Sequence, residues 1–328
     1  YDMIISGELP ESFRFPSDRI LAKQLRTTHI TLGKALNELR SQGFLSRSPS
    51  TGTFVNALSP DIIDAPGSPN KVVTVIFDNI DNSTFQSELF INLHMRLQKV
   101  SLDILTLSSN DDPMQQFEQI RSILLNPNCC SCVVWSILNN EQVAELQRLK
   151  PASFPLIFLD KNYSGIEHDA IVYDGFSAGQ ELMEYLLQDD FDEAYFFVRD
   201  RVLHFSSIQE RLHGMQNALI QNGYSENKLK IIAYKDVNEC YENNLLFNEK
   251  NKIVISASNT EAEHFIKLLR KKQMIYNNHI KHASFIGRNI YSETHIVEYR
   301  FSIEEMAKET VNLLVNRLNG DKSSAKII

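Results

Sequence analysis

Short apolar runs alternate with amphipathic stretches along most of the chain beyond residue 71. The runs are rich in β-branched and aromatic residues, as buried strands are, and they lie at 72–77, 103–107, 132–137, 155–160, 194–198, 230–234, 252–256 and 283–287. Apolar residues recur with helical spacing at 85–100, 114–125, 141–149, 177–187, 207–222, 238–247, 261–272 and 303–318. Apolar strands separated by helices predict parallel sheets covered on both faces. We therefore expect an α/β fold, with either one doubly wound sheet or two lobes around a cleft.

The first 55 residues follow a different pattern, with two short helices and a hairpin. Ser17 is the expected N-cap of the first helix, in which Ile20, Leu21 and Leu25 share an apolar face. Thr28 is the expected cap of the second helix. The expected inward positions of that helix are Leu32, Ala35, Leu36 and Leu39, and the outward ones are His29, Ile30, Gly33 and Lys34.

Two short strands, at 44–45 and 53–55, flank a polar loop directly after these helices. Two helices followed by a hairpin have the shape of a winged helix-turn-helix. The second helix of that motif enters the DNA major groove with its N-terminus first.

A proline-rich stretch separates the two patterns. Pro60, Pro66 and Pro69, together with Gly67, disfavour helix and sheet between Asn56 and Lys71. The expected organisation is a winged helix-turn-helix domain at 1–57, a linker at 58–71 and a larger domain at 72–328.

Composition and charge fit a globular protein with a weakly basic head. Hydrophobic residues make up 43% of the 328 positions and charged residues 23%. Residues 1–60 hold seven Lys and Arg against five Asp and Glu, and the remainder holds 26 against 36. This asymmetry fits a head that binds a polyanion, although alone it weighs little. No apolar run approaches the ~20 residues of a membrane span and no secretion leader opens the chain, so we expect a cytoplasmic protein.

The cysteines and the short motifs give no sign of catalysis. Four cysteines, three of them in CCSC at 129–132, do not make a disulfide framework in a chain of this size, and they indicate a reducing compartment. Neighbouring thiols on a strand alternate between faces and no second pair lies at ligand spacing, so we expect buried thiols rather than a metal site. Phosphate-loop, zinc-protease and nucleophile-elbow motifs do not occur. We expect no metal, no cofactor and no enzymatic activity.

The head carries a dense set of characteristic positions, namely Pro16-Ser17-Asp18-Arg19, Leu21-Ala22, Thr28, Thr31, Ala35-Leu36, Leu39, Gly43-Phe44-Leu45 and Gly52-Thr53-Phe54-Val55. They resemble the winged-helix signature of the GntR family of bacterial transcription regulators. The DNA-facing residues implied by this resemblance are Ser17, Arg19, Thr28, His29, Thr31, Lys34 and Gly52. An arginine can contact guanine through two donors, and a lysine or a helix N-terminus can hold phosphate. The family commonly has Arg where this chain has His29 and Gly33, so the operator sequence need not be a typical one.

The body carries longer landmarks, which are LIFLDKN at 156–162, IVYDGFSAGQELMEYLL at 171–187, SSIQERLHGMQNAL at 206–219 and RFSIEEMAKETVNLLVNRLNG at 300–320. They resemble the effector-binding domain of the LacI/GalR family, which is related to periplasmic sugar-binding proteins. The resemblance covers about Val72 to Gly320 and implies a two-lobed fold with parallel sheets and a ligand between the lobes.

The ligand-binding positions implied by this second resemblance are Asp78, Phe85, Trp135, Ser136, Asp160, Arg211, Ser258 and Asn289. Carboxylates and guanidinium groups match vicinal hydroxyls, and aromatic rings match the apolar face of a sugar. The chain departs from the pattern at Ser258, where Asn is frequent, and at Arg288-Asn289, where an aromatic residue and Asp are usual. The second exchange removes an acceptor and adds a cation, so a sugar acid or phosphorylated sugar is one candidate effector.

Together these features predict a ligand-responsive transcriptional regulator. We expect a homodimeric repressor that binds a near-palindromic operator in double-stranded DNA and is released by a sugar or sugar derivative bound between the lobes. The alternatives are an α/β solute-binding protein and an enzyme domain fused to a DNA-binding head. Secretion of the whole chain would favour the first, and the visible absorbance of a pyridoxal cofactor would favour the second.

Overall fold

The computed structural model describes residues 9–10, 12–41, 44–48, 52–56, 72–80, 83–126, 129–241, 250–274, 279–286 and 296–328. The chain divides into two compact units, Tyr1–Lys71 and Val72–Ile328, and each has its own core. The expected linker at 58–71 lies outside the described residues, as do Arg288 and Asn289.

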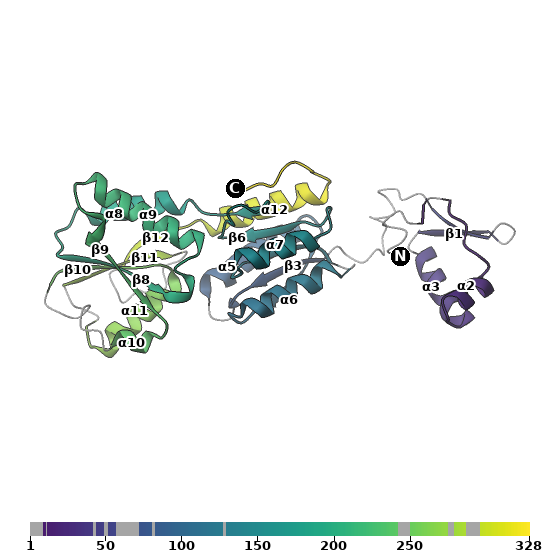
Figure 1. The fold of residues 1–328 in the computed structure, drawn as a ribbon, viewed down its shortest axis with the longest axis horizontal. Helices are drawn as coiled ribbons and strands as arrows, with labels where there is room; N and C mark the ends of the chain where they lie inside the picture. The colour runs from purple at the N-terminus through teal and green to yellow at the C-terminus, as the bar shows by residue number, and fades with distance from the viewer. Residues whose placement is uncertain are drawn as a thin grey trace. The chain divides into compact units, whose positions relative to one another are not determined.

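The first unit contains two helices followed by a two-stranded antiparallel hairpin (Figure 1). These elements are α2 (Asp18–Gln24), α3 (His29–Ser41), β1 (Leu45–Ser48) and β2 (Gly52–Val55). In the hairpin Leu45 lies opposite Val55 and Ser48 lies opposite Gly52. The small core beneath it is formed by Ala22, Leu32, Leu36, Phe44, Leu45 and Val55. The predicted order of two helices and a wing is confirmed.

The predicted inward faces of these helices are partly wrong. Ile20 and Leu25 are 54% and 61% exposed, and Ala35 is exposed as well. The core of this unit is small, so α2 contacts it only along the narrow strip of Leu21 and Ala22. Leu25 is the C-cap of α2, where the chain turns away from that strip.

The second unit consists of two lobes, each built on a parallel sheet of five described strands (Figure 1). The first sheet has the order β4-β3-β5-β6-β7 and contains β3 (Val72–Phe77), β4 (Asp103–Ser108), β5 (Cys129–Trp135), β6 (Leu156–Leu159) and β7 (Asp169–Ile171). The second has the order β12-β11-β10-β8-β9 and contains β8 (Glu193–Arg199), β9 (Leu229–Tyr234), β10 (Lys252–Ser256), β11 (Ile280–Ile286) and β12 (Ile296–Arg300). The two sheets therefore share one topology, and the predicted α/β fold with two lobes is confirmed.

Helices cover both faces of each sheet, as the apolar strand runs predict. The helices of this unit are α5 (Thr84–Gln98), α6 (Pro113–Leu124), α7 (Asn140–Leu149), α8 (Gly175–Leu186), α9 (Ser206–Gln221), α10 (Val237–Tyr241), α11 (Asn259–Lys271) and α12 (Ile303–Leu318). In the first lobe α5 and α12 pack on one face and α6 and α7 on the other. In the second lobe α8 and α9 cover one face and α10 and α11 cover the other.

The chain passes between the lobes twice. It leaves the first lobe after β7 and enters α8, and it returns after β12 through α12, which packs against α5 (Figure 1). Residues near the chain end also join the first lobe, since Ala170 donates its backbone N–H to the carbonyl of Lys326 at 2.8 Å. The first lobe is thus completed by a segment that is distant in the sequence.

Strands β7 and β12 were not predicted. Each lies at or near an edge of its sheet, and neither contains the continuous apolar run that marked the central strands. Strand β5 begins at Cys129, three residues earlier than expected, and Cys129 and Cys132 are buried in it as free thiols.

The described part of the chain offers neither a membrane anchor nor a metal centre. None of its helices combines the length and apolar character needed to cross a bilayer. Its His, Cys, Asp and Glu side chains form no group of three or more that could hold a metal ion.

Candidate functional site

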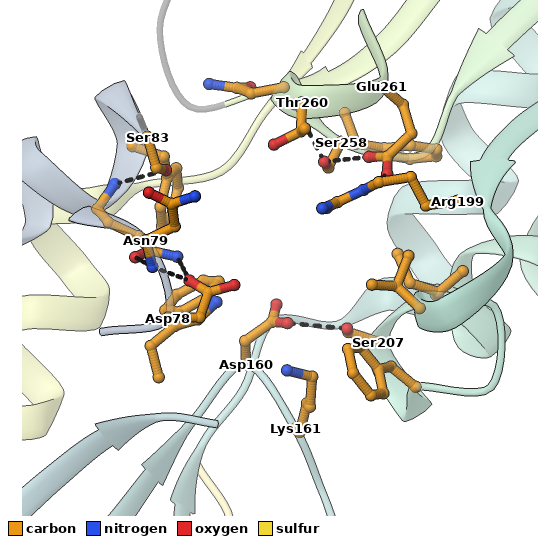
Figure 2. A pocket seen from close by; sticks show the side chains of 18 of the residues that line it. Asp78, Asn79, Ser83, Asp160, Lys161, Arg199, Ser207, Ser258, Thr260 and Glu261 are labelled. Atoms are coloured by element: carbon orange, nitrogen blue, oxygen red, sulfur yellow. Dashed lines mark hydrogen bonds and ion pairs between the residues drawn. The ribbon is translucent and has the colours of Figure 1, made fainter. Parts of the chain in front are cut away.

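A pocket of about 160 Å³ lies between the two lobes of the second unit, at the carboxyl ends of strands from both sheets (Figure 2). Asp78 directly follows β3 and Asp160 directly follows β6 in the first lobe. Arg199 ends β8 and Ser258 follows β10 in the second. In both sheets the first strand lies between the next two strands along the chain, and ligands of open parallel sheets bind where the strand order reverses in this way.

The structure brings six of the eight predicted ligand positions to this pocket, namely Asp78, Phe85, Trp135, Asp160, Arg211 and Ser258. Ser136 does not line it. Successive strand residues face opposite ways, and the fully buried Ser136 accepts a hydrogen bond at 2.5 Å from the hydroxyl of Tyr163. Asn289 lies outside the described residues, and ligand binding by the other six stays a prediction.

Asp160 and Arg211 connect the two lobes at one side of the pocket. Asp160 adopts a left-handed backbone conformation, with φ of 70°, and its carboxylate accepts a hydrogen bond at 2.9 Å from the hydroxyl of Ser207. Its other oxygen lies 3.6 Å from Nη2 of Arg211. The Nη1 of Arg211 donates to the carbonyl of Ala257 at 2.7 Å. The Nε of Arg211 is buried and has no hydrogen-bond partner among the described residues.

Two aromatic rings hold the Arg211 guanidinium. Its central carbon lies 5.3 Å from the ring centre of Phe285 and 4.9 Å from that of Phe301. Cation–π contacts at these distances fix the plane of the guanidinium group. The direction of its free donor is therefore set before any ligand binds.

Arg199 and Glu261 form a second charged pair across the pocket from Asp160 (Figure 2). Nε of Arg199 lies 2.5 Å from Oε1 of the fully buried Glu261, and the hydroxyl of Ser258 donates to the other oxygen. Burial alone would raise the pKa of Glu261, but the charge of Arg199 and the hydrogen bonds outweigh it and lower the pKa. Glu261 is thus an ionised residue that holds Arg199 and Ser258 in place.

Asp78 and Lys161 are further charged groups of the first lobe. Asp78 accepts hydrogen bonds from the side chain of Gln86 and from the backbone of Asn79, the latter at 2.9 Å. Burial raises the pKa of the Asp78 carboxyl. Lys161 is 3% exposed and its Nζ lies 3.9 Å from the ring centre of Phe205. Burial lowers its pKa, and the carboxylates of Asp160 and Asp78 offset only part of that effect.

Aromatic side chains complete the lining. The ring centres of Phe85 and Trp135 are 5.3 Å apart, and those of Phe85 and Tyr173 are 6.5 Å apart. Flat apolar walls beside carboxylates, a guanidinium group and hydroxyls are suited to a small polar molecule with an apolar face. The pocket is therefore chemically suited to a carbohydrate.

Sequence reasoning missed several residues that line the pocket, among them Asn79, Gln86, Asp111, Tyr173, Arg199, Phe205, Ser207, Glu261, Phe285 and Phe301. Arg199 could have been predicted from the sequence, because a charged residue directly after the buried run 194–198 marks the carboxyl end of a strand. Phe301 could not, because its position depends on strand β12, which the pattern did not show.

In the first unit, six of the seven predicted DNA-facing residues are exposed, namely Ser17, Arg19, Thr28, His29, Thr31 and Lys34. Thr28 caps α3, since its Oγ1 accepts a hydrogen bond at 3.1 Å from the backbone of Thr31. Ser17 stands at the N-cap of α2, although its side chain makes no capping hydrogen bond. Contact of these residues with DNA stays a prediction.

The seventh residue, Gly52, is half-buried at the start of β2 and has φ of 110°. A Cβ atom there would lie 3.3 Å from Nε of Arg14, so both the backbone and the space favour glycine. An ion pair of 2.9 Å between Arg47 and Asp18 ties the hairpin to the start of α2. The hairpin is therefore fixed in position relative to α2.

Comparison with known proteins agrees with this division. Residues 1–55 match the family model of the bacterial regulatory proteins of the gntR family. The arabinose metabolism transcriptional repressor of Geobacillus stearothermophilus is 21% identical over 188 residues, which cover 56% of this chain. The match covers 50% of that repressor, so the chain spans about half the length of the curated relative that it matches.

Solved structures resemble the second unit in fold. A LacI transcriptional regulator from Lactobacillus brevis superposes with a TM-score of 0.67 at 17% identity, covering 79% of this chain and 97% of that one. A second structure is a periplasmic binding protein/LacI transcriptional regulator from Alkaliphilus metalliredigens QYMF, complexed with D-xylulofuranose. It superposes with a TM-score of 0.64 at 13% identity, covering 79% of this chain and 94% of that one. The chain thus joins an N-terminal segment that matches the gntR family of bacterial regulatory proteins to a body with the fold of LacI-type transcriptional regulators.

Proposed function

We propose that this chain is a ligand-responsive, DNA-binding transcriptional regulator, a repressor whose affinity for its operator changes when a sugar or sugar derivative binds between the lobes. The observation that carries the proposal is a pocket that takes charged and aromatic groups from both lobes, in a chain whose first 55 residues match the gntR family. The names of two similar proteins, an arabinose metabolism repressor and a regulator complexed with a furanose sugar, support the choice of ligand.

The mechanism follows from the placement of the pocket. A ligand that touches both lobes stabilises one arrangement of the lobes over others, and it can shift the equilibrium only by its difference in affinity between them. If the head binds its operator in one of these arrangements only, ligand and DNA are thermodynamically coupled. We further propose a homodimer that acts on two half-sites in the cytoplasm, and a role in binding rather than catalysis.

The test uses the full chain and separates its two binding activities. An operator is selected from random duplex DNA, and its affinity is measured with and without a panel of sugars, sugar acids and sugar phosphates. Arg19→Ala should weaken operator binding by ~1 to 3 kcal/mol, because an exposed arginine of the head is lost. Arg121→Ala, which changes a half-exposed arginine of α6, is the matched control and should leave operator affinity unchanged.

Arg211→Ala should abolish the response to the effector and spare operator binding, because the pocket loses its fixed guanidinium group. Arg211→Lys, which keeps the charge and loses the planar donors, separates a folding defect from a binding defect. A normal effector response in the alanine variant, or unchanged operator affinity for Arg19→Ala at fixed salt, would contradict the assigned roles.

A further inference from the structure

The charged groups around the pocket restrict the charge of its ligand. The described lining contains four carboxyl side chains, Asp78, Asp111, Asp160 and Glu261. It contains three cationic side chains, Lys161, Arg199 and Arg211. Arg201, which pairs with Asp111 from the adjoining surface, brings the cations to four, so the described groups carry no excess of positive charge.

Each guanidinium group at the pocket already has a carboxylate beside it. Arg199 lies against Glu261 at 2.5 Å, and Arg211 lies 3.6 Å from Asp160. Arg201, at the adjoining surface, contacts Asp111 at 2.8 Å. Phosphates and carboxylates are bound by cationic groups that are free to neutralise them. Here an anionic ligand would have to compete with protein carboxylates and would bring another negative charge close to them.

Lys161 is also not a free cation that could neutralise an anionic ligand. Its Nζ rests on the ring of Phe205, and Asp160 and Asp78 are the carboxylates that act on its charge most strongly. A buried carboxylate that loses its cationic partner is costly, so a ligand that draws Lys161 or an arginine away destabilises the pocket.

The groups that remain available match hydroxyls. The carboxylates of Asp78 and Asp160 are turned toward the open centre of the pocket (Figure 2). The Nε of Arg211 is a buried donor without a partner among the described residues. A hydroxyl both donates and accepts, so neighbouring hydroxyls can satisfy a carboxylate and a guanidinium donor together. The rings of Phe85 and Trp135 supply an apolar wall beside them.

We infer that the ligand of this pocket is an uncharged polyhydroxylated molecule without a phosphate or carboxylate group. This inference rests on the proposed sugar-responsive function and narrows it. It also departs from the expectation drawn from Arg288, a residue outside those that the structure describes.

Matched pairs of ligands test the inference. Titration calorimetry with the full chain, at constant ionic strength, compares arabinose with arabinonate, ribose with ribose 5-phosphate, fructose with fructose 1-phosphate and glucose with glucose 6-phosphate. At least one uncharged member should bind, and its anionic counterpart should bind at least 100-fold more weakly. Asp160→Asn should weaken binding of the uncharged sugar by a similar factor, since asparagine tolerates the left-handed backbone and lacks the charge. Glu118→Gln, at an exposed position of α6, is the matched control and should bind as the parent does.

The outcomes separate this inference from the proposed function. If an anionic member binds as tightly as its uncharged parent or more tightly, the inference is overturned and sugar-responsive regulation stands. Loss of that binding in Arg288→Ala would then identify the cation responsible. If no member of any pair binds or changes operator affinity, the proposed function fails, and the inference fails with it.

Discussion

Asp160 shows how one residue can serve the fold and the pocket together. Its backbone N–H donates to the carbonyl of Ile171 at 2.9 Å, which holds the chain at the end of β6, and its φ of 70° turns the carboxylate toward Arg211. Aspartate is among the few non-glycine residues that tolerate this conformation. The motif LIFLDKN therefore predicts the position of the carboxylate, but the turn that aims it is visible only in the structure.

We expect His282 to make the stability of the second lobe sensitive to acid. Its Nε2 lies 2.8 Å from the hydroxyl of Ser256, while its Nδ1 is buried without a partner among the described residues. Burial lowers the pKa of His282 to about 3. The unfolded chain, with a histidine pKa near 6.5, takes up the proton first, so stability is lost as pH falls from about 6.5 toward 3. At pH 5 this one group lowers the free energy of unfolding by about 2 kcal/mol relative to neutral pH.

Thermal melting between pH 7 and pH 5 checks this expectation. His282→Gln keeps a polar group near Ser256 and removes the titration, so its melting temperature should fall less over that range than the parent's. His204→Gln, at an exposed histidine, should retain the parent's dependence. If the melting temperatures of the parent and of His282→Gln fall equally between pH 7 and pH 5, His282 is not the cause of the acid sensitivity.

At the scale of elements, helices α8 and α9 meet through glycine. A Cβ atom on Gly179 would lie 2.1 Å from the carbonyl oxygen of Arg211, and one on Gly214 would lie 2.0 Å from that of Phe176. These separations are far shorter than any real contact, and the obstacle is backbone, so the helices would have to move apart. Two glycines thus set the distance between these helices.

Gly179→Ala should destabilise the second unit by about 2 kcal/mol or more, because overpacking a close helix pair costs typically 1–3 kcal/mol and backbone cannot yield easily. Gly33→Ala is the control, since nothing lies within 4 Å of a Cβ there. It should stabilise α3 by up to about 1 kcal/mol through helix propensity. Differential scanning calorimetry measures both changes. A Gly179→Ala protein that melts with the parent would show that the helices can separate freely.

The elements that could be predicted were those with a clear apolar pattern in the sequence. Helix α12 was predicted at its observed bounds, because its apolar residues recur with helical spacing, and the structure adds Ser302 as its N-cap. Strands β7 and β12 were missed because neither contains a continuous apolar run, whereas the edge strands β4 and β9 were predicted from theirs. The pocket residues at the ends of central strands, such as Asp78 and Asp160, could be anticipated. Those contributed by the connections, such as Phe301, could not.

At the scale of the whole second unit, the buried contacts of Asp160 with Arg211 and Ser207 are joined by an exposed ion pair between the lobes. Nη2 of Arg201 lies 2.8 Å from Oδ1 of Asp111, and both side chains are partly exposed. An exposed ion pair contributes about 0 to 1 kcal/mol. A contact of this strength can favour one arrangement of the two lobes, but it contributes little to the folding stability of either lobe.

Arg201→Ala should therefore leave the melting temperature within a few degrees of the parent's and weaken ligand binding by about twofold to fivefold, the upper factor being what 1 kcal/mol supplies. Arg300→Ala breaks the 2.6 Å pair with Glu298, which lies within one strand, and should leave ligand affinity unchanged. Calorimetric titration with a sugar from the panel provides the measurement. A change equal to that of Arg300→Ala would mean that the pair between the lobes has no influence on binding.

The two passages between the lobes share a pair of rings. Tyr173, before α8, and Phe301, after β12, have ring centres 4.4 Å apart, and the hydroxyl of Tyr173 donates to the carbonyl of Ser302 at 2.9 Å. Both rings also line the pocket. A ligand that contacts these rings would therefore act directly on the two segments that connect the lobes. Under the proposed regulatory function, a ligand that leaves these two rings undisturbed should bind without changing operator affinity, whereas a ligand that contacts them should change it.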